Sequence, residues 1–328
     1  MEAFEYAAPK TTKEAIKLLD PEWGHTAILA GGTDLISGMK DGVMNPKRLV
    51  SLKHVKELRE ISYKPTSGLR VGAMATLQEL IDHPAVKRDF PVLIQAAENV
   101  RSEQLRNMGT VGGELLQRPR CWYYRLGYGL LAQSGGKSLV PDGDNRYHAI
   151  LGNSGPAYFV SPSMLAPILI ALGSTVEIRG PQGARRLDVE KLFVTPTQPG
   201  QREHAVKPNE VLTEIVVPHH TMAKSAVYEV RQKQGLDWPL AAAAVVLHMN
   251  GGTVSGARVV LGHVAPVPWV SQDAAEALQG KSVSEGVAAA AGAASVKGAH
   301  PLSKNGYKVQ LAKVAVKRAI LAATKGEA

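Results

Sequence analysis

The sequence is poor in cysteine and has no long apolar run, and each shortage excludes a class of protein. Cys121, the single cysteine among 328 residues, has no partner for an internal disulfide, which is compatible with a reducing compartment. No apolar run approaches the roughly 18 residues that span a bilayer. The N-terminal residues also lack the basic and apolar regions of a secretory signal. We therefore expect a cytoplasmic chain with no membrane span; export to the periplasm with a partner subunit is the alternative.

A nucleic-acid motif is also absent, although the net charge of the chain is +9. The lysines and arginines are scattered, and no basic run is interleaved with aromatic residues. We therefore expect no nucleic-acid binding and assign the charge to an acidic partner subunit or a phosphate-bearing ligand. With 45% hydrophobic residues, the chain is long enough for two or three packed subdomains.

Arrangements for side-chain catalysis are missing as well. Neither a Ser-His-Asp nor a Cys-His arrangement can be argued from spacing. His219 and His220 follow Pro218 with no carboxylate at metal-ligand spacing, so we interpret them as a solvated turn at a domain junction. No catalytic side chain and no metal site are therefore predicted within this chain.

Hydrophobic periodicity and capping signals predict an α+β chain. Capping boxes at Thr11 with Glu14 and at Thr76 with Glu79 each start a helix. The last helix is predicted to bury one face, formed by Leu311, Val314, Ala315, Ala319 and Ala322. Further helices are predicted over 93–100 and 164–172, and strands over 26–30, 47–52, 68–74, 175–179, 210–217, 242–249 and 253–262. Residues 118–148 show no periodicity, and an irregular loop of that length usually has, or once had, a function.

Two glycine-rich segments stand at predicted element boundaries. The first follows a strand and reads Leu29-Ala30-Gly31-Gly32-Thr33-Asp34-Leu35. The second follows a helix and reads Gly109-Thr110-Val111-Gly112-Gly113-Glu114-Leu115. Adjacent glycines let the backbone approach a phosphate closely, and their N–H groups can converge on an anion. One such segment is most often a simple turn, but two of them, each with a threonine, suit a diphosphate held between two subdomains.

Three segments carry a resemblance to a known family: AGGTDL at 30–35, RNMGTVGGELLQ at 106–117 and LDWPLAAAAV at 236–245. In order and spacing they resemble the FAD-binding medium subunit of the molybdenum hydroxylases, the family of xanthine dehydrogenase, carbon monoxide dehydrogenase and aldehyde oxidoreductase. The resemblance implies a vanillyl-alcohol-oxidase-type (PCMH) fold with two FAD-binding subdomains, followed by a C-terminal α+β domain of antiparallel sheet and helices. We place these three units at residues 1–58, 59–221 and 222–328.

The resemblance also implies that different subunits carry different cofactors. In this family FAD accepts electrons from a small subunit with two 2Fe-2S clusters and passes them to an external acceptor, while a molybdopterin large subunit oxidises the organic substrate. The grip on the FAD diphosphate carries over to two stretches, Ala30 to Asp34 and Thr110 to Glu114. Trp238 lies in a segment that resembles the loop near the isoalloxazine ring; it is a candidate for stacking on the flavin, with a core or interface aromatic as the alternative.

One departure from the family pattern concerns an iron–sulfur cluster. The segment that starts at Arg120-Cys121 resembles a loop that carries four cysteines around a four-iron cluster in the aldehyde oxidoreductase group. Here only Cys121 remains, Ala157 occupies the later ligand position, and leucines and Ser138 fill the middle of the loop. One thiolate cannot hold a cluster that requires four ligands, so we predict no iron–sulfur cluster in this chain. Cys121 is interpreted as a semi-buried free thiol.

Three further departures concern the flavin itself. Glu114 stands where the family has asparagine, and a carboxylate near a diphosphate is repulsive unless it points away or meets an arginine such as Arg106. Met164 replaces an aspartate that contacts the cofactor, and a thioether is a weak acceptor. Glu229 stands at a usually basic position, with Arg231 close by.

The preferred hypothesis is an FAD-binding electron-transfer subunit of a heteromeric molybdenum hydroxylase. The alternative is a degenerate scaffold subunit that has lost FAD and the four-iron cluster but still docks the other chains. A free-standing flavin oxidase is disfavoured, because no histidine or cysteine is placed for covalent attachment of a flavin. Tyr123, Tyr124 and Tyr128 are candidates for a subunit interface.

Overall fold

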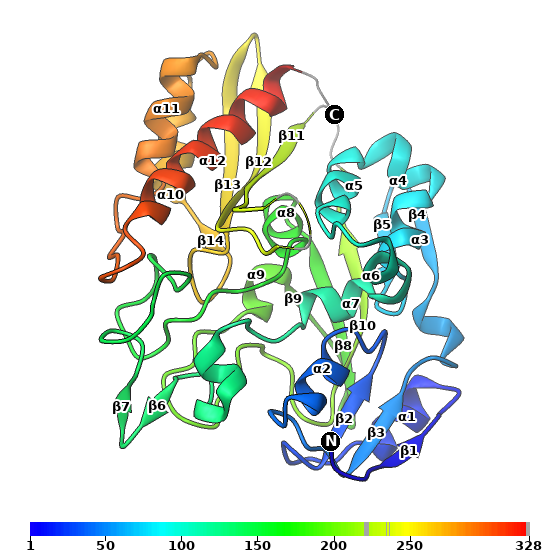
Figure 1. Cartoon of the computed structure of the whole chain (residues 1–328). Coiled ribbons are helices and arrows are strands. Elements are labelled where there is room, and N and C mark those ends of the chain that lie inside the picture. Colours follow the sequence, from blue (N-terminus) through cyan, green and yellow to red (C-terminus); the bar gives the residue numbers. More distant parts are fainter. Residues whose placement is uncertain (220–222, 234, 236, 326–328) are drawn as a thin grey trace.

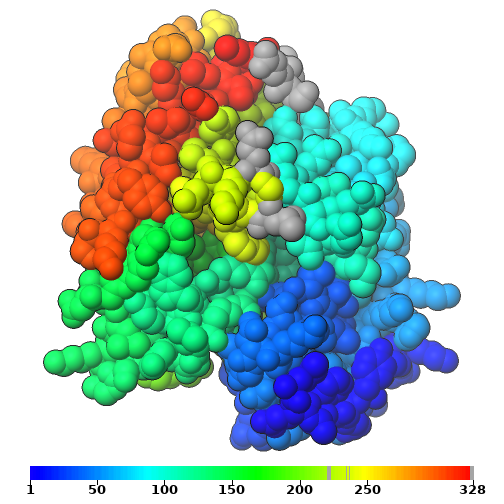
Figure 2. All heavy atoms as spheres, in the orientation of Figure 1, coloured from blue at the N-terminus to red at the C-terminus, as the bar shows by residue number. Residues whose placement is uncertain are grey.

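Three larger β-sheets with their helices follow one another along the chain, and a small two-stranded sheet of β6 (Gln133–Ser134) and β7 (Lys137–Ser138) lies within the irregular 118–148 segment (Figure 1). The computed structural model describes residues 1–219, 223–233, 235 and 237–325, so His220 and Leu236 of the predicted motifs lie outside the described residues. Figure 2 shows the N-terminal residues as the lower right of the molecule and the C-terminal helices at the upper left. Within the described ranges, no helix is both long and apolar enough to cross a membrane.

The N-terminal sheet is parallel and ends at the first glycine segment. Its middle strand, β3, pairs with β1 on one side and with β2 on the other. The first glycine segment connects the carboxyl end of β2 to the helix α2. The elements of this unit are β1 (Glu5–Ala7), α1 (Thr12–Leu18), β2 (Thr26–Leu29), α2 (Leu35–Lys40), β3 (Arg48–Ser51) and the 3₁₀ turn η1 (Lys56–Leu58).

The central sheet is antiparallel, in the order β4-β5-β10-β8-β9. Its strands are β4 (Ile61–Lys64), β5 (Gly68–Gly72), β8 (Thr175–Gly180), β9 (Gly183–Asp188) and β10 (Val211–Val217). Its helices are α3 (Leu77–Asp82), α4 (Pro84–Asp89), α5 (Pro91–Glu98), α6 (Glu103–Met108), α7 (Val111–Leu115), α8 (Ala166–Ala171) and α9 (Val189–Leu192). The second glycine segment lies between α6 and the end of α7, and the largest apolar core fills the space between sheet and helices.

The C-terminal sheet is also antiparallel, in the order β11-β12-β13-β14. Its strands are β11 (Lys224–Val230), β12 (Ala241–Asn250), β13 (Thr253–Gly262) and β14 (Trp269–Val270). Three helices cover one face of it (Figure 1), namely α10 (Gln272–Leu278), α11 (Glu285–Ala294) and α12 (Tyr307–Lys325). The three sheets lie within the three units that we propose, 1–58, 59–221 and 222–328.

Strand β12 is buried on both faces from residue 241 to residue 247, which explains the unbroken apolar sequence of that stretch. Ala244 and Val246 belong to the central core, beside α8, whereas Ala243 and Val245 belong to the core under the C-terminal helices. Because successive side chains of a strand point to opposite faces, a strand covered on both sides needs no polar alternation. The C-terminal sheet is thereby joined to the central unit through a shared apolar core.

The two predicted capping boxes differ in outcome. At α3 the box is complete, since Thr76 accepts from the Glu79 amide at 3.1 Å and Glu79 accepts from the Thr76 amide at 2.7 Å. At α1, Thr11 accepts from the Glu14 amide at 3.1 Å, but the Glu14 carboxylate accepts from the Lys10 amide instead. The predicted box at Thr11 is therefore only half formed.

The buried face of the last helix is rotated by about one residue from the predicted apolar face, so that prediction is partly wrong. Of the predicted face only Ala315 and Ala319 are fully buried, and Leu311, Val314 and Ala322 are partly exposed. The buried face of α12 consists of Lys308, Ala312, Ala315, Val316, Ala319, Ile320 and Ala323. Alanines on several sides of this helix make its apolar stripe ambiguous in the sequence, so packing against β11 and β12 decides the rotation.

Lys308, in the first turn of α12, is the least expected residue of that face because its side chain is charged and only 1% exposed. Its Nζ donates to the carbonyl oxygens of Tyr147 and His148, each at 3.1 Å, and of His263 at 2.8 Å. Burial lowers the pKa of Lys308 to about 7. These bonds attach the end of the irregular 118–148 segment to the C-terminal domain.

Replacing Lys308 by methionine is expected to lower the free energy of unfolding by about 3 kcal/mol, because buried carbonyl oxygens lose their donor. Thermal unfolding followed by circular dichroism measures the loss. Lys313→Met, at a partly exposed position of the same helix, is the control and should unfold close to the wild type. Equal melting temperatures for the two variants would contradict this anchoring role.

Candidate functional site

A cavity of about 220 Å³ lies where the two glycine segments meet, and we call it the glycine cavity. The first segment supplies Ala30 to Leu35, and the second supplies Thr110, Gly112 and Gly113. The remaining wall is mostly apolar and includes residues that the sequence did not single out, such as Ile28, Met44, Leu52, Met74, Val211 and Leu212. The two segments, about 80 residues apart in the chain, therefore line one shared groove, which was the central expectation from the sequence.

The two glycine segments touch each other, and the contact requires glycine. A Cβ atom added to Gly31 would lie 1.9 Å from the carbonyl oxygen of Met108, at the end of α6. Gly32 has a φ angle of +77°, in the left-handed region that glycine adopts most easily. A Cβ atom on Gly112 would lie 2.9 Å from the carbonyl oxygen of Ala73. Gly31 and Gly112 therefore allow a close approach of two backbone segments, and Gly32 allows an unusual turn.

The amides of the two segments are used differently. In the second segment, Val111 and Gly112 donate to the carbonyls of Ala75 and Ala73, and Gly113 donates to the Thr110 hydroxyl. In the first segment, the amides of residues 31–34 donate to no acceptor within the described part of the chain. The first segment therefore offers backbone donors to an anion, while the second forms the opposite wall.

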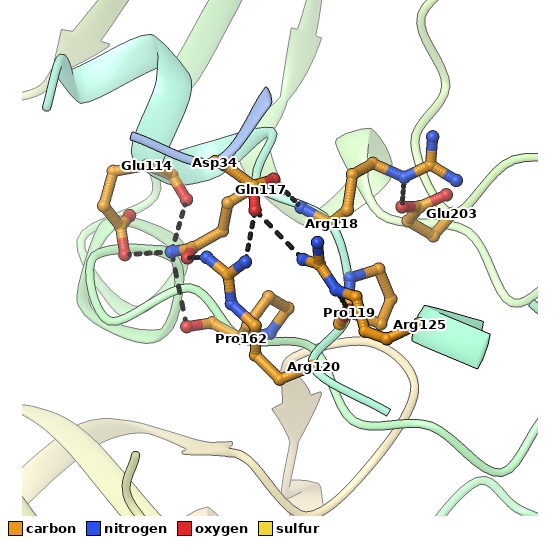
Figure 3. A network of polar contacts seen from close by, with 9 residues as sticks. All are labelled: Asp34, Glu114, Gln117, Arg118, Pro119, Arg120, Arg125, Pro162 and Glu203. Carbon is orange, nitrogen blue, oxygen red and sulfur yellow. Dashed lines mark hydrogen bonds and ion pairs between the residues drawn. The ribbon is translucent and has the colours of Figure 1, made fainter. Parts of the chain in front are cut away.

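Asp34 lines the glycine cavity, and its carboxylate also anchors the start of the irregular 118–148 segment (Figure 3). It accepts from the Arg118 amide at 2.7 Å, from Arg125 at 3.0 Å and from Arg120. Burial alone would raise the pKa of Asp34, but Arg120, the Arg118 amide and Arg125 outweigh it and lower the pKa below its usual value. Asp34 is therefore an anion with three partners from one segment.

A second ion pair completes this arginine network. The Arg118 side chain pairs with Glu203, and the two side chains are only 13% and 4% exposed (Figure 3). Tyr124 lies under the guanidinium groups of both Arg118 and Arg125, at 5.2 and 5.7 Å from its ring centre. Because Tyr124 is 6% exposed, its assignment to a subunit interface is wrong; it belongs to the interior of this network.

A second cavity of about 180 Å³ adjoins the first, and we call it the junction cavity. It shares Thr33, Asp34, Gly113 and Gln117 with the glycine cavity. From there it extends to the turn between α5 and α6 and to the C-terminal domain, where Arg231, Asp237 and Trp238 line it. The two cavities thus adjoin at these shared residues, and we call them together the path from the N-terminal sheet to the C-terminal domain.

Glu114 lines the junction cavity with its carboxylate turned into the protein. It accepts from the Ser163 hydroxyl at 2.7 Å, the Met164 amide at 2.5 Å and the Gln117 side chain at 3.0 Å. It does not meet Arg106, which binds Gln78 and a backbone carbonyl instead. Glu114 therefore links α7 to the residues before α8, and its orientation removes the predicted repulsion of a diphosphate.

Replacing Glu114 by glutamine is expected to remove a pH dependence of stability. Burial raises the pKa of Glu114 from 4.5 to about 7, against the opposing effect of its donors. Between those two pH values the native chain holds a proton that the unfolded chain has lost. The stability of the wild type therefore falls as the pH rises through this range, by on the order of 3 kcal/mol.

Urea unfolding at pH 5 and pH 8 checks this prediction. The wild type should lose more stability between the two values than Glu114→Gln does. The exposed Glu103→Gln variant is the control and should follow the wild type. If Glu114→Gln kept the full pH dependence, its carboxylate would not be the group that titrates.

Arg231 connects the two other departures from the family pattern, Glu229 and Met164, and it lines the junction cavity together with Met164. Glu229 and Arg231 form an ion pair at 2.5 Å, with both side chains 8% exposed. Arg231 also reaches the Met164 sulfur at 3.6 Å and the Asn99 carbonyl at 2.5 Å. The acidic residue at the usually basic position is thus neutralised by its neighbour at the end of the same strand, whereas Asp237, which also lines the junction cavity, accepts from the Trp238 amide at 3.0 Å.

Trp238 separates the junction cavity from a third one. The Arg120 guanidinium lies over the Trp238 ring, 4.6 Å from its centre, and both residues line cavities on either side. Asp34 fixes Arg120 from the other side. Asp34, from the first glycine segment, thus positions Arg120. Arg120 in turn holds Trp238 at the end of the path by a cation–π contact.

Cys121 is a free thiol beside an apolar cluster. Its Sγ lies 3.2 Å from Nε2 of His148, and burial raises its pKa to about 11. Ala157, at the later ligand position of the family's cluster loop, packs with Leu131 and Phe159. Among the residues that the structure describes, no three His, Cys, Asp or Glu side chains gather to hold a metal ion.

All but one of the predicted cofactor residues line the glycine cavity or the junction cavity. Nine of them line the glycine cavity, and Glu114 and Trp238 line the junction cavity. Leu29 lies in β2 and lines neither. Sequence reasoning missed Arg118, Arg120 and Arg125 as partners of Asp34, although their clustering was visible in the charge pattern.

Comparison with known proteins identifies the family of this chain. Residues 2–220 match the family described as FAD binding domain in molybdopterin dehydrogenase, and residues 226–323 match the CO dehydrogenase flavoprotein C-terminal domain. The aldehyde oxidoreductase FAD-binding subunit PaoB of Escherichia coli (strain K12) is 32% identical over 95% of this chain and 96% of its own length. The carbon monoxide dehydrogenase medium chain of Hydrogenophaga pseudoflava is 29% identical over 98% and 96%.

Solved structures share the fold across the whole chain. A carbon monoxide dehydrogenase from Hydrogenophaga pseudoflava, lacking the Mo-pyranopterin moiety of its cofactor, aligns with a TM-score of 0.76 at 29% identity, over 99% of this chain and 98% of that one. Quinoline 2-oxidoreductase from Pseudomonas putida 86 aligns with a TM-score of 0.77 at 27% identity over the same shares. The predicted α+β FAD-binding fold is confirmed, and the chain belongs to the family of FAD-binding medium subunits of molybdopterin-dependent dehydrogenases.

Proposed function

We propose that this chain is the FAD-binding electron-transfer subunit of a heteromeric molybdenum hydroxylase. The observation that carries the proposal is the meeting of the two glycine segments at one cavity, with the unpaired amides of residues 31–34 on its wall. Relatives named as medium chains or FAD subunits of carbon monoxide dehydrogenase, aldehyde oxidoreductase and nicotinate dehydrogenase support it.

The residues along the path fit an extended dinucleotide. The amides of the first glycine segment would hold the diphosphate. Thr110, from the second glycine segment, lines the same cavity. The apolar wall of the glycine cavity suits the adenine end, and the junction cavity with Trp238 suits the flavin ring. The three arginines of the network face two carboxylates, Asp34 and Glu203, so one positive charge would remain available to a bound diphosphate.

FAD, when bound, supplies the redox chemistry, and the chain positions it and sets the charge around it. We propose that electrons enter from a small subunit with two 2Fe-2S clusters, which a molybdopterin large subunit reduces, and leave to an external acceptor. The net charge of +9 suits docking against acidic partner surfaces. The cytoplasm, a reducing compartment, suits a chain whose single cysteine is free.

Flavin content tests this proposal directly. The purified chain should absorb at about 450 nm and release about one FAD per molecule on heat denaturation. Two observations favour the scaffold alternative. Arg231 and Glu229 neutralise each other, and Met164 offers no strong donor or acceptor to a cofactor. A folded chain that assembles with its partner subunits, yet carries no flavin and takes up none from added FAD, would establish the scaffold.

A further inference from the structure

A third cavity, of about 180 Å³, continues the path beyond Trp238, and we call it the aromatic cavity. It shares Arg120, Asp237 and Trp238 with the junction cavity, so Trp238 with its stacked Arg120 is a common wall. Its lining comes from the irregular 118–148 segment and from the C-terminal domain, and it includes Trp122, His148, Phe159, His263 and Lys308. The proposed FAD path and this cavity are therefore direct neighbours.

Two buried imidazoles of this lining have an unsatisfied nitrogen. His263 is 2% exposed, and its Nε2 has no partner within the described ranges; His148 is 3% exposed, and the same holds for its Nδ1. Burial, together with the nearby Lys308, lowers the pKa of His263 to about 3 and that of His148 to about 4, so both rings are neutral and each has one N–H donor. Since buried polar atoms normally have partners, these nitrogens indicate a polar occupant of the cavity.

The other lining residues select the shape of that occupant. Trp122 and Trp238 present indole rings, and Phe159 presents a phenyl ring that is 2% exposed. Trp122 packs edge to face against His148, with 5.6 Å between ring centres, which fixes both rings. A cavity with rigid aromatic walls and a few polar atoms suits a small flat molecule with hydrogen-bond acceptors.

We propose that the aromatic cavity binds a quinone, which serves as the electron acceptor of the FAD site; the electron-accepting role rests on the proposed function. His263 donates a hydrogen bond to one quinone carbonyl, and the indole and phenyl rings sandwich its flat ring. The quinone takes up two electrons and two protons, which reduced FAD and solvent supply, and leaves as a quinol. Both C=O bonds become C–OH groups, so no further reactant is needed.

Two other occupants fit the lining less well. A nicotinamide dinucleotide needs a diphosphate grip, and this wall has no glycine-rich turn. A metal cluster needs several thiolates, and Cys121 is the only cysteine of the chain. A quinone needs only a flat apolar slot and one or two donors, which is what the lining offers.

Isothermal titration of the full chain with duroquinone tests the site. Its four methyl groups block addition of the Cys121 thiol to the ring, so the titration reports binding alone. Val160 lines the aromatic cavity and neither of the other two, so Val160→Phe should fill the slot and weaken binding at least about ten-fold. The control Val194→Phe, at an exposed position that lines none of the three cavities, should bind like the wild type.

His263→Asn tests the donor separately. His263 has a φ angle of +61°, and asparagine tolerates this left-handed conformation, so the backbone carbonyl that accepts from Lys308 should stay in place. The variant should keep its flavin and bind duroquinone about five- to ten-fold more weakly. Stopped-flow oxidation of dithionite-reduced protein by duroquinone should slow in Val160→Phe but not in Val194→Phe.

The outcomes separate this inference from the proposed function. Duroquinone that fails to bind a flavin-loaded wild type, or that binds Val160→Phe as well as the wild type, would overturn the quinone site and leave FAD binding untouched. Absence of FAD from the wild type would overturn the proposed function, and the accepting role with it. The titration would still show whether the cavity takes a quinone.

Discussion

Gly31→Ala is expected to reduce the FAD content of the purified chain more than about ten-fold. The added Cβ would lie 1.9 Å from the Met108 carbonyl oxygen and 3.2 Å from the Cα of Gly109. Neither neighbour is the flexible end of a side chain, so the two glycine segments would have to separate. Overpacking of this kind costs about 1–3 kcal/mol or more, and it opens the cavity that both segments build.

The measurement is the ratio of flavin to protein absorbance after purification, followed by titration of the apo-chain with FAD. Gly298→Ala is the matched control, because Gly298 has open space around it and no positive φ angle. It should keep its flavin. A Gly31→Ala chain with a full complement of FAD would show that the close approach of the two segments is not needed to seat the diphosphate.

Local signals in the sequence were sufficient for much of this site. Gly31 and Gly112 were singled out because adjacent glycines at element boundaries have a backbone meaning that depends little on the rest of the chain. A strand was also predicted over 242–249, and β12 covers that range, although its burial on both faces was not predicted. The complete capping box at Thr76 also depends on neighbouring residues alone.

Partners that are distant in sequence were beyond such signals. Asp34 was assigned to the diphosphate grip, yet its carboxylate binds residues 84 to 91 positions further along the chain. Glu114 was identified as a problem for the cofactor, and its partners 49 to 51 positions away were not visible. Lys308 was not expected in a core, because its three acceptors become neighbours only when α12 packs against two other segments.

Asp34→Asn is expected to disrupt the arginine network and to lower the free energy of unfolding by about 3–5 kcal/mol. The substitution keeps the shape of the side chain but removes the charge that Arg120 and Arg125 share, and their side chains are only 27% and 16% exposed. It also turns one acceptor oxygen into a donor that faces other donors. Since Arg120 stacks on Trp238, the disturbance reaches the ring end of the FAD path.

The pH dependence gives this prediction a second, independent readout. Because the pKa of Asp34 is lowered in the native chain, its contribution to stability is present above the unfolded pKa near 3.8 and is lost as the pH falls through the native value. The wild type should therefore lose stability toward acid more steeply than Asp34→Asn. Asp273→Asn, whose carboxylate is 53% exposed and 4.0 Å from Lys297, is the control and should unfold like the wild type at every pH. If Asp34→Asn matched that control in stability at neutral pH and in FAD affinity, the arginines would be held in place without this carboxylate, and the first glycine segment would act on the cofactor through its backbone alone.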